Sequence, residues 1–201
     1  MKLDPFYLIV DSAAWVERLV PLGVKLVQLR TKDQDEASLR REIRASKAVC
    51  DSHGCQLIVN DYWRLAIEED CDFVHLGQED LAEADVKAIR RAGVRLGLST
   101  HDGAELETAL QAEPDYVALG PIYPTILKAM KWAPQGLDRI AAWKQRLGEL
   151  PLVAIGGLTV ERVAGVFAHG AQSAAVVTDV ARNTLPEART AEWLAATAQW
   201  R

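Results

Sequence analysis

The sequence predicts a single-domain (β/α)8 barrel of the TIM type over residues 1–201. Short apolar runs typical of buried strands recur eight times, and segments with helical periodicity lie between them. Consecutive runs start mostly ~20 to 30 residues apart, which is the length of one βα unit. A closed barrel leaves eight such strands without a free edge. A doubly wound open sheet is the alternative that this pattern leaves open.

The predicted strands are rich in β-branched and aromatic residues, which favour extended structure. In chain order they are "FYLIV" from position 6, "KLVQLR" from 25, "QLIVN" from 56, "DFVHLG" from 72, "RLGLS" from 95, "DYVALG" from 115, "PLVAIGG" from 151 and "SAAVVT" from 173. Since parallel strands in such folds are covered on both faces, continuous apolar runs are expected there.

The segments between these runs carry helix signals. In residues 35–54, Leu39 and Ile43 supply an apolar stripe, and Gly54 is a typical stop. In "GLTVERVAGVFAHG", Thr159 is a plausible N-cap and Gly170 follows the last turn. Strands and helices therefore alternate along the chain, as the barrel requires.

Composition narrows the function classes. The chain of 201 residues has 49% apolar and 25% charged residues and a net charge of −5, which argues against nucleic acid or an anionic membrane as the main partner. Three cysteines without zinc spacing indicate reduced thiols. The first apolar stretch is too short for a signal peptide or a membrane span, so we expect a cytoplasmic protein. A homo-oligomer remains open.

Polar side chains gather where the second predicted strand ends. Gln28, Arg30 and Lys32 occupy every second position, so Gln28 and Arg30 face the same side of the strand as Leu26. A buried guanidinium without a partner is costly, and its planar fork suits phosphate oxygens. The pattern therefore predicts an anion at this strand end.

Each of the predicted strands from the third to the eighth also ends in polar residues or glycines. In a barrel the carboxyl ends of all strands meet on one face. Asp61 and Asp80 follow neighbouring strands, and two carboxylates together with phosphate oxygens and water are a usual Mg²⁺ site. A role for each aspartate as a helix cap is the alternative. His75 and His101 have no evident partner in the sequence, which favours polar wall residues over catalysts.

Two further segments suit a phosphate site. "AIGGL" places two glycines between a strand and a helix, where bare backbone N–H groups bind phosphate, although a tight turn explains them nearly as well. Residues 121–136 form one long irregular stretch with three prolines, which predicts a functional loop. Trp132 in this stretch is a candidate cover for the site.

An ordered set of motifs resembles the thiamine phosphate synthase family: "QLRTK", "VNDYW", "HLGQEDL", "GLSTH", "LGPIYPT" and "AIGGL". The resemblance implies a (β/α)8 barrel that joins a hydroxymethylpyrimidine diphosphate to a thiazole phosphate, with Mg²⁺ and with diphosphate as leaving group. It implies that the pyrimidine diphosphate is held by Gln28, Arg30, Lys32, Asn60, Ser99 and Lys128. It implies Asp61 and Asp80 as metal ligands, and it places the thiazole phosphate at Thr125, Gly157, Val177 and Thr178.

The sequence departs from the family pattern at two positions on the thiazole side. Leu127 stands where a threonine is usual, and Asp179 adds a carboxylate beside the expected phosphate site. These departures keep two alternatives open. One is the related thiazole tautomerase, which needs no diphosphate site. The other is a non-catalytic paralogue that binds thiazole or thiamine phosphates.

Overall fold

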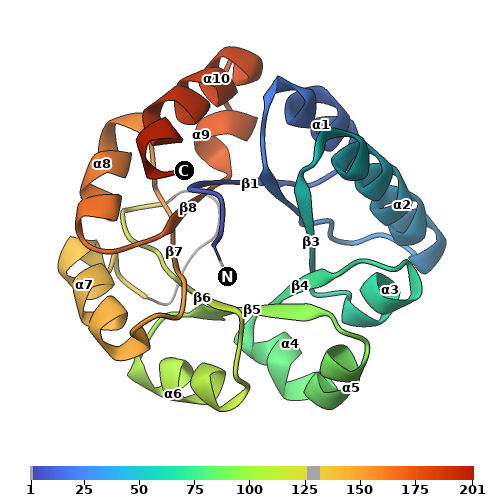
Figure 1. Ribbon diagram of the computed structural model, residues 1–201, viewed down its shortest axis with the longest axis horizontal. Coiled ribbons are helices and arrows are strands. Elements are labelled where there is room, and N and C mark those ends of the chain that lie inside the picture. The colour runs from blue at the N-terminus through green and yellow to red at the C-terminus, as the bar shows by residue number, and fades with distance from the viewer. Residues whose placement is uncertain (1, 126–131) are drawn as a thin grey trace.

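The computed structural model describes residues 2–125 and 132–201, and within them eight parallel strands pair in chain order to close a barrel. Figure 1 looks along the barrel, with the strands in the middle and helices around them. The closed ring confirms the predicted fold and excludes the open sheet. The strands are β1 (Phe6–Val10), β2 (Leu26–Leu29), β3 (Gln56–Asn60), β4 (Phe73–Leu76), β5 (Arg95–Thr100), β6 (Tyr116–Leu119), β7 (Leu152–Ile155) and β8 (Ser173–Val176).

Helices follow the strands and form the outer layer (Figure 1). They are α1 (Ala13–Leu19), α2 (Glu36–His53), α3 (Trp63–Glu68), α4 (Gln78–Glu83), α5 (Val86–Arg91), α6 (Gly103–Gln111), α7 (Gly136–Leu147), α8 (Val160–Ala168), α9 (Thr178–Ala181) and α10 (Pro186–Thr197). Two 3₁₀ turns, Val20–Leu22 and Ala198–Trp200, complete the regular elements of residues 2–125 and 132–201.

Local sequence determines where α2 begins and ends. The Asp35 carboxylate accepts a hydrogen bond from the backbone N–H of Ser38, so it caps the first turn. Gly54 ends the helix at φ 58°, a left-handed conformation that glycine adopts without a Cβ clash. Leu39 and Ile43 are buried on its inner face, as the apolar stripe predicts.

Alternation along the strands separates two apolar layers. Residues such as Val27 and Leu29 face outward into the core shared with the helices. Leu26, Ile58 and Phe73 face inward with the aromatic rings of Tyr7 and Tyr116, and these side chains fill the barrel. The interior is therefore packed rather than open, and burying each large side chain contributes about 1.5–3 kcal/mol.

The ring closes where β1 pairs with β8, in the register Phe6 with Ala174. The C-terminal helix α10 supports this seam, because the Trp193 ring stacks on Phe6 with centroids 5.4 Å apart. Ser173 donates a hydrogen bond to the backbone carbonyl of Asp4 at 2.8 Å. Elements from both ends of the chain thus hold the last strand against the first.

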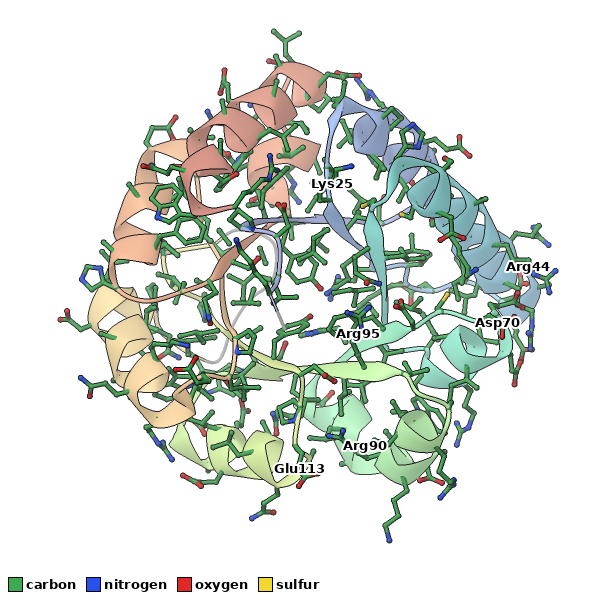
Figure 2. The ribbon with its side chains drawn as sticks, viewed as in Figure 1. Lys25, Arg44, Asp70, Arg90, Arg95 and Glu113 are labelled. Carbon is green, nitrogen blue, oxygen red and sulfur yellow. The ribbon has the colours of Figure 1, made fainter. Side chains whose placement is uncertain are left out.

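Charged residues line the amino ends of the strands. Arg95, at the start of β5, lies over the Phe73 ring at 4.5 Å from its centroid and donates to Asp72 at 2.6 Å. Figure 2 shows Arg95 reaching toward the middle of the barrel, whereas Arg44 lies on the outer rim. A cavity of about 350 Å³ lies at this end, with Asp4, Lys25 and Arg95 in its lining. The polar residues predicted to form a site instead follow the carboxyl ends of the strands.

Candidate functional site

Strand β2 directs Gln28 into the barrel, as its parity with Leu26 predicts. Gln28 is 2% exposed, and its Nε2 donates to the hydroxyl of Tyr7 at 2.6 Å. Arg30 follows the strand and is half-buried, with a backbone N–H bond to the carbonyl of Val10 at 2.8 Å. Its guanidinium is close enough to Asp61 and His75 to influence both pKa values. Arg30 therefore carries a positive charge at the carboxyl end of the barrel.

Asp61 and Asp80 come together at this face. Burial and the neighbouring carboxylate of Asp80 raise the pKa of Asp61 to about 6, although Lys32 and Arg30 act in the opposite direction. Neither carboxylate is the N-cap residue of the helix it precedes or begins, since Tyr62 and Gly77 occupy those positions. Two carboxylates and two cations that follow β2, β3 and β4 along the chain thus share one region.

Backbone geometry holds Asp61 in place. Its φ of 64° lies in the left-handed region, which aspartate tolerates better than most residues. Its N–H donates to the carbonyl of His75 at 2.9 Å, which ties the end of β3 to β4. Among the described residues, no group of three or more His, Cys, Asp or Glu side chains could hold a metal ion. A cation here would need further oxygen ligands from a substrate or water.

Ser99 on β5 and His75 on β4 are in hydrogen-bond contact inside the barrel. The hydroxyl of Ser99 lies 2.8 Å from His75 Nε2, and His75 Nδ1 lies 2.7 Å from the hydroxyl of Tyr116. Burial, with a smaller contribution from Arg30, lowers the pKa of His75 to about 3, so its ring is neutral at pH 7. Asn60, at the end of β3, is 5% exposed. The sequence indicated no partner for His75, and the structure gives its ring two.

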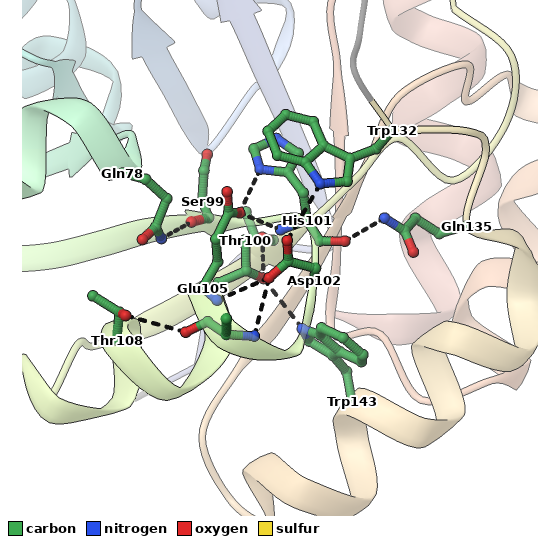
Figure 3. Close-up of polar contacts among 12 residues, drawn as sticks. Gln78, Ser99, Thr100, His101, Asp102, Glu105, Thr108, Trp132, Gln135 and Trp143 are labelled. Carbon is green, nitrogen blue, oxygen red and sulfur yellow. Dashed lines mark hydrogen bonds and ion pairs between the residues drawn. The ribbon is translucent and has the colours of Figure 1, made fainter.

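His101 also has partners that the sequence did not indicate. Its Nδ1 lies 2.7 Å from Glu105, and its ring stacks on Trp132 with centroids 4.0 Å apart (Figure 3). Gln135 donates to the backbone carbonyl of His101. These contacts fasten the end of the 121–136 segment to the end of β5, which positions Trp132 beside the site face.

The loops after β6 and β7 lock together around the paired glycines. Gly157 has φ 64°, and an added Cβ would lie 2.8 Å from the Cβ of Tyr123. Tyr123 donates its N–H to the carbonyl of Gly156 at 3.0 Å. Half-buried Thr125 follows on the same loop. The two adjacent glycines are therefore needed for close backbone approach, and the structure brings Thr125 and Gly157 to the same face.

The carboxylate of Asp179 does not face the site as a free charge. Val177 and Thr178 are half-buried at the start of α9, where the phosphate was expected. Asp179 instead accepts hydrogen bonds from Arg189 at 2.8 and 3.1 Å and from Trp193 Nε1 at 2.7 Å. Its charge is thus paired, which corrects the expectation of an unfavourable carboxylate beside a phosphate. Lys128 and Leu127 lie outside the described residues.

Comparison with known proteins shows which family the chain belongs to. The family model for thiamine monophosphate synthase matches residues 6–180. A thiamine-phosphate synthase of Rhizobium etli is 72% identical over 201 residues, covering 100% of this chain and 98% of that protein. The chain belongs to the thiamine monophosphate synthase family.

Other members of the thiamine monophosphate synthase family are more distant in sequence. A thiamine-phosphate synthase of Salmonella dublin is 47% identical over 193 residues, covering 96% of this chain and 88% of that protein. Thiamine phosphate pyrophosphorylase from Pyrococcus furiosus has a TM-score of 0.87 at 20% identity, with 98% of this chain and 96% of that one covered. This last likeness shows the barrel fold alone.

Two inward-facing tyrosines of this family member were not among the predicted site residues. The Tyr7 and Tyr116 hydroxyls lie 2.9 Å apart inside the barrel and connect Gln28 to His75. The sequence did contain an indication that these two tyrosines are paired with polar groups. Both tyrosines occupy strands at buried positions, and a buried phenol needs a hydrogen-bond partner.

Proposed function

We propose that this protein is a thiamine phosphate synthase. It would join 4-amino-2-methyl-5-hydroxymethylpyrimidine diphosphate to a thiazole phosphate and release diphosphate. The observation that carries this proposal is the meeting of Asp61 and Asp80 with Arg30 and Lys32 at the carboxyl end of the barrel. Family membership and the two curated relatives named as thiamine-phosphate synthases support it.

Magnesium fits the carboxylates of this site. Asp80 lies close enough to Asp61 to disfavour the charged form of the Asp61 carboxyl, and a cation between the two would relieve that repulsion. With only two protein carboxylates, the remaining ligands would be diphosphate oxygens and water, as Mg²⁺ commonly binds. The bound ion would supply positive charge to the leaving diphosphate.

The protein side chains would perform the remaining tasks. Arg30 and Lys32, together with Lys128 outside the described residues, would neutralise charge that grows on the departing diphosphate. Gln28, Asn60 and Ser99 would hold the pyrimidine diphosphate through neutral hydrogen bonds. No protein nucleophile is required in a dissociative substitution, because the thiazole nitrogen captures the pyrimidine-methyl cation after the C–O bond to diphosphate breaks.

The acceptor would bind beside the β6 and β7 loops. Thr125, Gly157 and the stretch Val177–Thr178 lie at the same end of the barrel and would hold the thiazole phosphate. Pairing of Asp179 with Arg189 keeps one carboxylate from opposing this anion. Trp132, stacked on His101, would help to exclude water from the reactive cation.

An assay with both substrates and Mg²⁺ tests the proposal. Purified protein should form thiamine phosphate and release one diphosphate per turnover. Asp80→Ala should lower turnover at least ~100-fold, because the leaving group loses part of its charge compensation. Asp85→Ala is the matched control, since it removes an exposed helix-capping aspartate on α5. Interconversion of thiazole isomers alone would favour a tautomerase, and binding without turnover a non-catalytic paralogue.

No helix in the described part of the chain is both long and apolar enough to cross a membrane. We also propose a cytoplasmic location, in keeping with an enzyme that uses small phosphorylated substrates.

A further inference from the structure

A row of hydrogen bonds crosses the barrel interior from β2 to β5. Gln28 Nε2 contacts Tyr7 at 2.6 Å, the Tyr7 hydroxyl contacts that of Tyr116 at 2.9 Å, and Tyr116 contacts His75 Nδ1 at 2.7 Å. His75 Nε2 then contacts the hydroxyl of Ser99 at 2.8 Å. We refer to these five residues as the interior row.

Water has little access to most of this row. Gln28, Tyr7, Tyr116 and His75 are between 0% and 7% exposed, whereas Ser99 is half-buried at the site face. The donors and acceptors of the first four residues must therefore be satisfied mainly within the protein. Ser99 is the most exposed member of the row and lies at the site face.

The side-chain amide of Gln28 determines which residue donates and which accepts in each hydrogen bond of the interior row. Gln28 Nε2 is an amide nitrogen and can only donate, so Tyr7 accepts from it. Among the described residues, the Tyr7 hydroxyl proton then has Tyr116 as its remaining partner. By the same reasoning, the proton of Tyr116 goes to His75 Nδ1.

The tautomer of His75 determines the direction of its hydrogen bond with Ser99. A neutral imidazole with Nδ1 as acceptor carries its proton on Nε2, so Nε2 donates to the Ser99 oxygen. That oxygen is occupied as an acceptor, and the hydroxyl proton of Ser99 is left to point toward a ligand. Gln78 also holds the strand here, since its Nε2 donates to the Ser99 carbonyl at 2.6 Å (Figure 3).

We propose that Tyr7, Tyr116 and His75 are positioning residues that fix Ser99 as a hydrogen-bond donor to the pyrimidine diphosphate. This inference rests on the proposed function. The substrate offers acceptors of two kinds, pyrimidine ring nitrogens and diphosphate oxygens, and neither can donate. A serine already polarised as a donor needs no reorganisation when such an acceptor arrives.

The packing of Tyr116 makes removal of its hydroxyl a clean test. Its ring contacts Phe73 at 5.6 Å and His75 at 5.5 Å between centroids, and glycine at position 97 leaves room for it. Tyr116→Phe keeps these ring contacts and removes only the link in the row. Tyr7→Phe is a second variant that breaks the row one residue earlier, should Tyr116→Phe fail to fold.

Steady-state kinetics should then separate positioning from general damage. Tyr116→Phe should raise KM for the pyrimidine diphosphate about 3- to 10-fold, the usual effect of one neutral hydrogen bond. The KM for the thiazole phosphate should not change. In a Ser99→Ala background, Tyr116→Phe should have no further effect on the pyrimidine diphosphate KM, because the donor that it orients is gone.

Thr100→Val is the matched control for a buried hydrogen bond on the same strand. Its hydroxyl donates to the Ala118 carbonyl at 3.0 Å and accepts from Trp143 at 3.1 Å, away from the row (Figure 3). This variant should lose stability without a change in either KM. A KM unchanged in Tyr116→Phe, or raised equally with and without Ser99, would overturn the proposal.

Inorganic diphosphate, used as a competitive inhibitor, distinguishes the two acceptors. An inhibition constant that rises in Tyr116→Phe as much as the KM supports donation to a diphosphate oxygen. An unchanged constant with a raised KM supports donation to the pyrimidine ring. If wild-type protein forms no product, the proposed function fails. Calorimetric binding of the pyrimidine diphosphate to the same variants then still decides whether the row orients Ser99.

Discussion

The carboxylate of Asp179 is held by the guanidinium of Arg189 through two hydrogen bonds, from Nε at 2.8 Å and from Nη2 at 3.1 Å. Both side chains are 14% exposed. The fork geometry of arginine suits a carboxylate and draws it toward α10. A residue that departs from the family pattern therefore has its charge compensated within this chain.

Arg189→Ala should release that charge at the expected thiazole phosphate site. We expect a loss of about 3 kcal/mol in the free energy of unfolding, because one partner of a mostly buried pair is removed. The KM for the thiazole phosphate should rise roughly 10-fold through like-charge repulsion. Urea unfolding and steady-state kinetics measure the two effects.

The double variant Arg189→Ala/Asp179→Asn serves as the rescue. It should return the thiazole phosphate KM to near the wild-type value, since no free carboxylate remains. Arg40→Ala is the matched control, because Arg40 also binds several carboxylates but lies on α2. A KM that stays raised in the double variant would show that charge is not the cause.

Asp61→Asn should change how stability depends on pH. The pKa of Asp61 in the folded protein is about 6, raised by burial and by Asp80, above the value of about 4 in an unfolded chain. The folded state therefore binds more protons between these pH values, and the contribution of Asp61 to stability falls as pH rises from about 4 to 6. Asparagine keeps the left-handed backbone and removes this titration.

Urea unfolding at several pH values without divalent metal measures this effect. Between pH 4 and 7, wild type should lose about 1 kcal/mol relative to Asp61→Asn, a figure reduced for partial solvent screening. Asp33→Asn is the matched control, because Asp33 has φ 57° and is exposed. Parallel stability curves for wild type and Asp61→Asn would contradict the prediction.

Gly157→Ala should disturb the contact between the β6 and β7 loops. A left-handed alanine alone costs about 1–2 kcal/mol, and the clash of its Cβ with the Pro124 carbonyl oxygen and with Tyr123 should add about 1–3 kcal/mol. The KM for the thiazole phosphate should rise as the loop moves. Gly93→Ala separates the two costs, because Gly93 has φ 73° and nothing within 4 Å of an added Cβ. Equal losses in both variants would exclude the steric contribution.

Lys128→Ala should lower turnover more than it changes either KM. This expectation rests on the sequence match, since Lys128 lies outside the described residues. A charge that matters most as diphosphate departs is typically worth about 100- to 1,000-fold in kcat. Lys25→Ala is the control, because Lys25 donates to the His53 carbonyl at the opposite end of the barrel. A change confined to KM would contradict the proposed timing.

Much of the barrel could be predicted because its signals are local. Eight apolar runs gave eight strands, and the period of two along β2 placed Gln28 inside with Leu26. Gly54 ended α2 as expected, since a left-handed C-cap needs no tertiary information. Where neighbouring residues determine the outcome, the sequence was sufficient.

The contacts that escaped prediction depend on meetings across the barrel. Tyr7 and Tyr116 are 109 positions apart, and nothing in either strand indicates the other as its partner. Likewise, the charge of Asp179 looked unfavourable because its partner Arg189 lies on another helix. Such pairs are set by strand tilt and helix packing, which a linear pattern does not specify.

The long separation of Tyr7 and Tyr116 also bears on how the protein matures during translation. Tyr7 is synthesised 109 residues before Tyr116, so its hydroxyl stays without this partner until that further length of chain has been made. Contacts of such high sequence separation form late and slow the search for the native state. In a partly synthesised barrel that has only its early strands, the Tyr7 hydroxyl would therefore lack this hydrogen bond until β6 joins the ring.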